Sequence, residues 1–217
     1  GNVDAARPLV EDAVAIDPEY ADARVFATAI ALDVGDVDAA KGHLDAFDQL
    51  DAPPFIEQLV VQQGLRDRLA DIAQNDAFAR VEPVALVDDP VPFSETGLTV
   101  DDVLLAAEAL AAQGEPFTGI QLGEWMLESV PENPDALAGQ GWLLARSATS
   151  DALAPAEIGL TFLDRALGVE SAHPEALVYR AFVHNFLGDP VSAAADLAAF
   201  DDLDTRPADL RGLILAF

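Results

Sequence analysis

The sequence predicts an all-α fold, an α-solenoid built from helix-turn-helix repeats and arranged as two tandem halves. Its composition is 51% hydrophobic but only 7% aromatic, which favours helices packed through small side chains over a β-sandwich. The turn at Gly1-Asn2 recurs as Gly35-Asp36. A second, longer register aligns 44–51 with 197–204 without a gap, and we call it the long repeat. A short period inside a long one indicates helical hairpins that repeat within two related halves.

Small residues recur at the positions of each unit where the paired helices approach most closely. A unit that begins at Ala21 has Thr28 and Ala40 there. Units that begin at Val100, Pro134 and Pro174 keep this register, with small residues at Ala107 and Gly119, at Gly141, Gly159 and Ala166, and at Ala181 and Ala193. The unit at Pro134 is longer than the others, because it carries an insertion around 147–154.

Helix boundaries follow from apolar residues spaced three and four apart and from the Gly, Pro and Asp residues between them. Proline marks three boundaries, at Pro18, Pro134 and Pro174, because the preceding residue avoids the helical region and proline suits the first turn. The pattern predicts helices over 3–16, 20–33, 37–50, 54–72, 100–113, 117–130, 135–146, 155–169, 175–187, 190–203 and 207–216.

The segment 74–99 differs from the rest, because Pro83, Pro90, Pro92 and Gly97 should break any long helix. The predicted organisation is a first half over 1–73, an irregular connector over 74–99, and a second half over 100–217 that ends in a capping helix. The long repeat pairs Gly1 with Ala154, so the first half lacks a counterpart of the helix at 135–146. We therefore expect that the chain starts inside a unit, downstream of at least one further helix.

Charge and composition exclude several classes of partner. The formal net charge is −28, with 39 Asp and Glu against 11 Lys and Arg. Nucleic acids and anionic lipid surfaces are polyanions, and proteins that bind them need a basic patch. No apolar run approaches the ~20 residues of a membrane span. We expect no nucleic-acid partner and no direct membrane contact in this chain.

Motifs for cofactors and metals are missing. The chain has no Cys, which excludes a thiolate zinc site and a cysteine nucleophile. The glycines at 139 and 141 lie inside a predicted helix, whereas a phosphate-binding loop needs them between a strand and a helix. The histidines are scattered and are interpreted as surface or helix-end residues: His43, His173 and His184. We expect no cofactor and no metal site.

Carboxylate pairs are abundant, which weakens them as a sign of catalysis. General acid-base chemistry needs one desolvated and one ionised carboxyl group in a cleft. Asp101-Asp102 follows Thr99, where acidic residues complement the start of a helix. We expect a protein that is not an enzyme, unless the fold brings several carboxylates together in a closed pocket.

The step from Gly1 to Gly35 matches the helix-turn-helix unit of the tetratricopeptide repeat (TPR) in length. The chain resembles TPR proteins over 1–51 and 100–206. This resemblance implies a superhelix whose concave groove is lined by the first helix of each unit, and a non-enzymatic role in binding a protein or peptide with apolar anchors. The family's ligand-binding positions give these candidate groove residues in the second half: Leu104, Glu108, Ala138, Trp142, Arg146, Val178, Phe182, Asn185 and Phe186. Aromatic residues beside Arg and Asn are typical of a binding hot spot.

Two functions remain open on the sequence alone. In the first, the chain is a scaffold that binds its partner in the groove. In the second, it is a structural or oligomerisation spacer whose groove is filled by 207–216 or by the connector. The Lys, Asn and Arg clamp by which chaperone-binding TPR domains hold a carboxylate has no counterpart here. The oligomeric state and the partner's identity are not given by the sequence.

A narrower similarity concerns bacterial envelope TPR proteins, including the subunit that holds apocytochrome during cytochrome c maturation. It depends on the general repeat pattern and on short stretches such as 141–146. It implies a role in the assembly of envelope proteins or cytochrome c, and a location outside the cytoplasm behind an upstream membrane anchor. A cytoplasmic location is the alternative.

Overall fold

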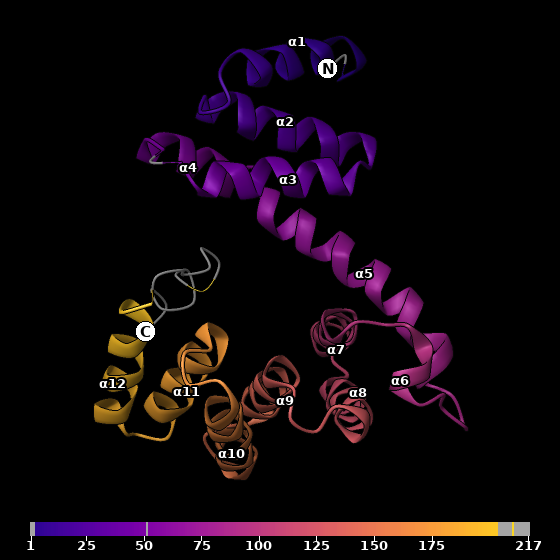
Figure 1. Ribbon diagram of the computed structural model, residues 1–217, viewed down its shortest axis with the longest axis vertical. Helices are drawn as coiled ribbons and strands as arrows, with labels where there is room; N and C mark the ends of the chain where they lie inside the picture. Colours follow the sequence, from indigo (N-terminus) through magenta and orange to yellow (C-terminus); the bar gives the residue numbers. More distant parts are fainter. Residues whose placement is uncertain (1–2, 51, 204–209, 211–217) are drawn as a thin grey trace. The chain divides into compact units, whose positions relative to one another are not determined.

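In the computed structural model the chain is built from α-helices joined by short turns (Figure 1). The structure describes all residues except 1–2, 51, 204–209 and 211–217. The chain forms two compact units, Gly1–Ala73 and Gln74–Phe217, and each is considered by itself. Within the described residues, the β-pairing consists of one isolated antiparallel bridge, between Thr149 and Ala152.

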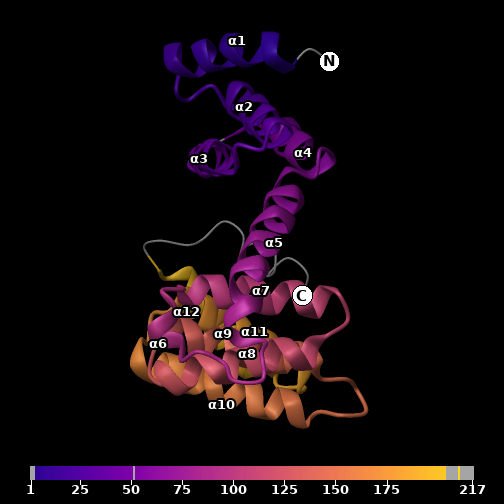
Figure 2. The same ribbon diagram turned by 90° about the vertical axis from the view of Figure 1, so that its right-hand side faces the viewer.

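The first unit is a series of helical hairpins (Figure 2). Its helices are α1 (Val3–Ile16), α2 (Ala21–Val34), α3 (Val37–Asp48), α4 (Pro54–Gln62) and the first part of α5 (Leu65–Ala85). Its buried core is drawn from α2, α3, α4 and the start of α5, and includes Val25, Leu44, Phe47, Ile56 and Leu65. No residue of α1 belongs to that buried core among the residues described.

The turn between α2 and α3 shows how the local sequence ends one helix and starts the next. Gly35 has a φ of 77°, a left-handed conformation that costs glycine little. Asp36 follows as the N-cap of α3, and its carboxylate accepts a hydrogen bond from the backbone N–H of Ala39. In the Gly-Asp pair that identified the repeat, Gly35 therefore ends α2 and Asp36 begins α3 as its N-cap.

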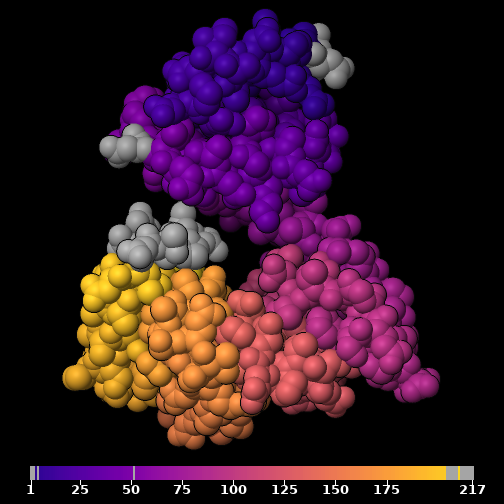
Figure 3. All heavy atoms as spheres, in the orientation of Figure 1, coloured from indigo at the N-terminus to yellow at the C-terminus, as the bar shows by residue number. Residues whose placement is uncertain are grey.

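The second unit stacks further hairpins in sequence order. It contains the end of α5, then α6 (Phe93–Thr96), α7 (Val100–Ala112), α8 (Pro116–Ser129), α9 (Pro134–Ser147), α10 (Ala154–Val169), α11 (Pro174–Phe186) and α12 (Pro190–Asp201). From α7 onward, each helix packs on the next. In the space-filling view the sequence colours accordingly follow one another across this unit, from magenta to yellow (Figure 3). The first helices of successive hairpins also touch, α7 on α9 and α9 on α11. This part of the chain is an all-α solenoid.

Glycine allows two of these helix pairs to approach closely, as the small-residue register predicts. A Cβ atom on Gly119 of α8 would lie 2.7 Å from the carbonyl oxygen of Ala107 on α7. Across α9 and α10, a Cβ atom on Gly141 would lie 2.8 Å from the carbonyl oxygen of Gly159. Both distances are too short for a real side chain, so these positions require glycine.

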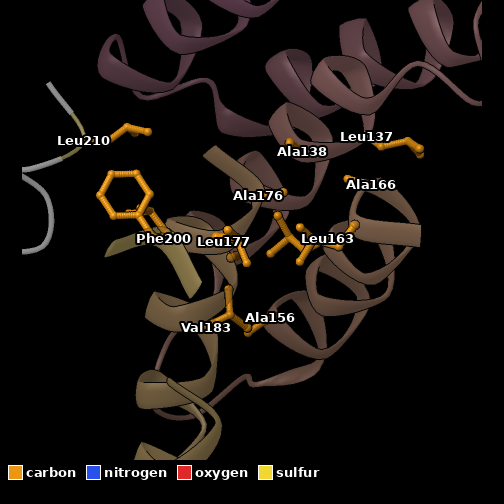
Figure 4. Packing of buried hydrophobic residues seen from close by; sticks show 13 residues of the cluster. Leu137, Ala138, Ala156, Leu163, Ala166, Ala176, Leu177, Val183, Phe200 and Leu210 are labelled. Carbon is orange, nitrogen blue, oxygen red and sulfur yellow. The ribbon is translucent and has the colours of Figure 1, made fainter. Parts of the chain in front are cut away.

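The core of α9 to α12 fills the space between these close contacts. Figure 4 shows Leu163 of α10 beside Leu177 of α11, with Val183 near Ala156. Phe200 of α12 is also fully buried in this cluster.

The two halves share a three-helix block. The long repeat carries the first residues of α2 and α3, Ala21 and Val37, onto those of α11 and α12, Pro174 and Pro190. It also carries the last residue of α1, Ile16, onto that of α10, Val169. The equivalent turn glycines at 35 and 188 have φ values of 77° and 84°. The helix ends therefore keep the long repeat that the sequence shows.

Predicted and observed helix boundaries agree to within two residues for α1 to α3 and for α7 to α12. The single helix expected over 54–72 is wrong, because the chain breaks at Gly64, where φ is 58°, and continues as α5. The irregular connector expected over 74–99 is wrong for 74–85, which is helical. Ala77 and Val81 are fully buried in the core of the second unit, and that burial outweighs the cost of Pro83 near the helix end.

The rest of the expected connector, 86–99, contacts α8 through Val91 and Phe93. Phe93 is buried and lies edge-on to Trp125, with ring centroids 5.6 Å apart. The indole N–H of Trp125 donates a hydrogen bond of 3.0 Å to the carbonyl oxygen of Val91. The capping helix expected over 207–216 lies outside the described residues, except for Leu210, which is buried in the α9 to α12 cluster. Among the helices described, none is long and apolar enough to cross a membrane.

Candidate functional site

The candidate site is one face of the second unit, formed by the first helices of its three hairpins, α7, α9 and α11. We call it the α7–α9–α11 face. Gly139 of α9 lets α9 approach α7 closely, because it has no side chain. A Cβ atom at this position would overlap the methyl groups of Leu104 on α7. Leu104 therefore packs over a helix surface without a side chain. The candidate residues of this face lie three and four positions apart, so they share one side of each helix.

An aromatic cluster holds α9 against α11. The ring of Trp142 stacks on that of Tyr179, with centroids 4.6 Å apart and planes 9° from parallel. Phe182 meets Trp142 edge-on, with centroids 5.2 Å apart. The Arg146 guanidinium lies over the Trp142 ring, 5.8 Å from its centroid. Stacked, edge-on and cation–π contacts each add to the burial of these rings.

Glu108 gives the face a partly desolvated acid. Burial raises the pKa of the Glu108 carboxyl group, and the positive charge of Arg146 opposes that rise. Glu108 comes from α7 and Arg146 from α9, so this electrostatic interaction is between neighbouring repeats. Three residues of the face are exposed to solvent: Arg146, Asn185 and Phe186, the last by 38%.

The structure divides the predicted groove residues into three groups. Ala138 and Val178 are fully buried and lie inside the unit. Trp142, predicted as a groove residue, is only 8% exposed, because Tyr179, Phe182 and Arg146 surround its ring. The others reach the surface wholly or in part: Leu104, Glu108, Arg146, Phe182, Asn185 and Phe186.

Tyr179 is part of the aromatic cluster but is not among the predicted groove residues. Tyr179, Phe182 and Phe186 are spaced three and four residues apart on α11, a pattern that places three aromatic rings on one stripe of the helix. That spacing alone could have identified Tyr179 as a neighbour of Trp142. The family positions pointed instead to the adjacent Val178, whose side chain is in the interior.

The histidines have structural roles. His173, expected at the surface or at a helix end, is the N-cap of α11 but is buried. Its Nδ1 accepts a hydrogen bond from the N–H of Ala176, which leaves Nε2–H to donate to Asp135 over 3.0 Å. His43 is half-buried beside Arg24, and burial followed by that charge lowers the pKa of its imidazole. The described residues hold no group of three His, Asp or Glu that could bind a metal ion.

Comparisons with known proteins add little to this geometry. No protein-family model matches the sequence, and no curated protein matches it. Among solved structures, the chain is similar to YrrB, a TPR protein with an unusual peptide-binding site. The identity is 12% and the TM-score 0.44, over 96% of this chain and 98% of that one. A likeness at this level identifies neither a family nor a ligand for this chain.

Proposed function

We propose that the second unit is a non-enzymatic interaction scaffold that binds a protein or peptide with apolar anchors on the α7–α9–α11 face. One observation carries the proposal: the Trp142–Tyr179 stack holds α9 against α11, beside the exposed side chains of Arg146 and Phe186. A surface that is already ordered loses little conformational entropy when a ligand binds. Rigid aromatic residues next to Arg are also the composition of an interface hot spot.

The chemistry of the face suggests how a ligand would lie. Phe186 and Leu104 offer apolar contact, and Asn185 offers an amide that both donates and accepts hydrogen bonds. Arg146 supplies donors for a backbone carbonyl or a carboxylate of the ligand, although it is also attracted to Glu108. A peptide that crosses α7, α9 and α11 would place one apolar side chain on Phe186 and another near Leu104.

A peptide selection against the full chain tests this function. Peptides are selected from a random library, and binding of the best one is measured by calorimetry with Phe186→Ala and Arg146→Glu. Each change should weaken binding at least about tenfold, a loss of about 1.4 kcal/mol. The matched control is Phe117→Ala, which removes an equally large ring that is 76% exposed on α8, away from this face. Equal effects of Phe186→Ala and Phe117→Ala would contradict the proposal.

The alternative is a spacer whose face is covered by the chain itself. In that case, the selected peptides would bind elsewhere, and Arg146→Glu would change stability without changing affinity. Within the scaffold function, the similarity to the cytochrome c maturation subunit suggests apocytochrome and other envelope proteins as the first partners to try. Their binding should show the same dependence on Phe186 and Arg146.

A further inference from the structure

Glu108 indicates what kind of ligand the α7–α9–α11 face takes, so this inference rests on the proposed function. Glu108 lies on α7, one turn after Leu104, and is partly buried. In the part of the chain that the structure describes, its carboxyl group accepts no hydrogen bond and forms no ion pair. Donors for this carboxyl group must therefore come from solvent or from a bound ligand.

The two buried acids described in the second unit are held by the protein itself. Asp102, on the first turn of α7, pairs with Arg80 of α5 over 2.7 Å. Asp196 of α12 pairs with Arg180 of α11 over 2.6 Å. In both cases an arginine offsets the loss of contact with water. Glu108 differs from them, because the burial of its carboxyl group is not matched by a donor.

Arg146 does not supply that donor. Its guanidinium group lies over the ring of Trp142, and it acts on Glu108 through charge alone, without a hydrogen bond. Burial is the larger influence on Glu108, since the pKa of its carboxyl group is raised in spite of the positive charge of Arg146. The ionised carboxylate is therefore short of favourable partners within the face.

We propose that Glu108 binds a lysine or arginine side chain of the partner and is the specificity-determining residue of the α7–α9–α11 face. An ammonium or guanidinium group supplies both a positive charge and N–H donors. The stem of either side chain is apolar and can pack on Leu104, which lies on the same side of α7. The partner is then a segment with a basic residue next to its apolar anchors.

The net charge of the chain favours such a partner at long range. At −28 it attracts cationic segments and repels anionic ones. Exposed acids add little to the affinity of a complex, because water and salt screen their charges. Glu108 is already partly out of water, so an ion pair there is screened less and also fixes where the basic residue lies on the face.

Selection from two peptide libraries against the full chain tests the proposal. Both have acetylated N-termini; one is fully random and the other lacks lysine, arginine and histidine. The tightest binders should come from the first library and carry lysine or arginine at one position.

Calorimetry then measures the pairing with Glu108. Replacing the basic residue of the best peptide by norleucine, which keeps an apolar stem, should weaken binding at least about tenfold. Glu108→Gln should weaken the basic peptide equally, and should change the affinity of the norleucine peptide less than about twofold. Glu124→Gln is the matched control, because it removes the same charge from an exposed position on α8 and should change affinity less than about twofold.

Two results would overturn this inference and leave the proposed function standing. One is a set of equally tight binders from both libraries that depend on Phe186 but not on Glu108. The other is a set of binders that carry aspartate or glutamate, because Arg146 would then be the residue that pairs with the ligand. If neither library yields a peptide that depends on Phe186, the proposed function fails and this inference fails with it.

Discussion

Arg180 on α11 binds Asp196 on α12 through two nitrogens on one edge of its guanidinium group. Nε donates to one carboxylate oxygen over 2.9 Å, and a terminal nitrogen donates to the other over 2.6 Å. A further terminal nitrogen donates to Asp164 of α10 over 2.8 Å. Asp196 is buried, whereas Asp164 is exposed. One side chain thus joins three consecutive helices.

Removing Asp196 should destabilise the second unit. Asp196→Ala leaves Arg180 without its buried partner, and the free energy of unfolding should fall by about 2–4 kcal/mol. Denaturant unfolding followed by tryptophan fluorescence measures it, because both tryptophans, Trp125 and Trp142, lie in this unit. Asp164→Ala is the control and should cost at most about 1 kcal/mol, as for an exposed pair. Equal losses would show that Asp196 is not the dominant partner.

The first unit has different residues at the three positions of this network, and a cleft lies there. Glu11, Ala27 and His43 stand at the places of Asp164, Arg180 and Asp196, and together with Arg7 they line a cleft between α1, α2 and α3. The double change Ala27→Arg with His43→Asp should rebuild the bridge. The first unit should gain about 1 kcal/mol of stability, seen as slower hydrogen exchange in α2 and α3. No gain over Ala27→Arg alone would show that the two junctions differ in geometry.

Gly141 should tolerate no side chain. A methyl group there would lie 2.8 Å from the carbonyl oxygen of Gly159 and 2.8 Å from Cγ of Leu163. Gly141→Ala should therefore cost about 1–3 kcal/mol of unfolding free energy. Gly168→Ala, on α10 with nothing within 4 Å, should instead gain about 0.5–1 kcal/mol, because alanine restricts the unfolded chain. Thermal unfolding of the two variants should move in opposite directions, and a shift of the same sign would contradict the close contact.

Glu108 should make the second unit less stable as pH rises. Its folded pKa lies above the ordinary value of 4.5, so the folded state holds the proton more tightly than the unfolded state does. Stability is then lost as pH rises from about 4.5 through the folded pKa. Glu108→Gln should be more stable than the unchanged chain at pH 7, and the difference should vanish below about pH 4.5. The free energy of unfolding of both chains is measured across this pH range. A difference between them that does not change with pH would contradict the raised pKa of Glu108.

Most helix boundaries could be predicted from the local sequence, because capping residues, glycine and proline act within one or two helical turns. Thr99 and Asp102 form a capping box at the start of α7, and Asn133 caps α9 just before Pro134. The exceptions show what local signals cannot weigh. Pro83 and the neighbouring breakers predict an irregular chain, but buried Ala77 and Val81 keep α5 helical through this region. Burial against residues far along the chain is invisible to a local pattern.

The sequence by itself determined the short repeat, the long repeat and the small residues between paired helices, because each depends on spacing along the chain. Only the tertiary structure decided which aromatic rings are buried and which reach solvent. Trp142 and Phe186 are both aromatic residues at predicted groove positions, yet Tyr179, Phe182 and Arg146 surround Trp142, whereas Phe186 is exposed. Exposure depends on neighbours brought together by packing of α9 on α11, which spacing within a single helix does not describe.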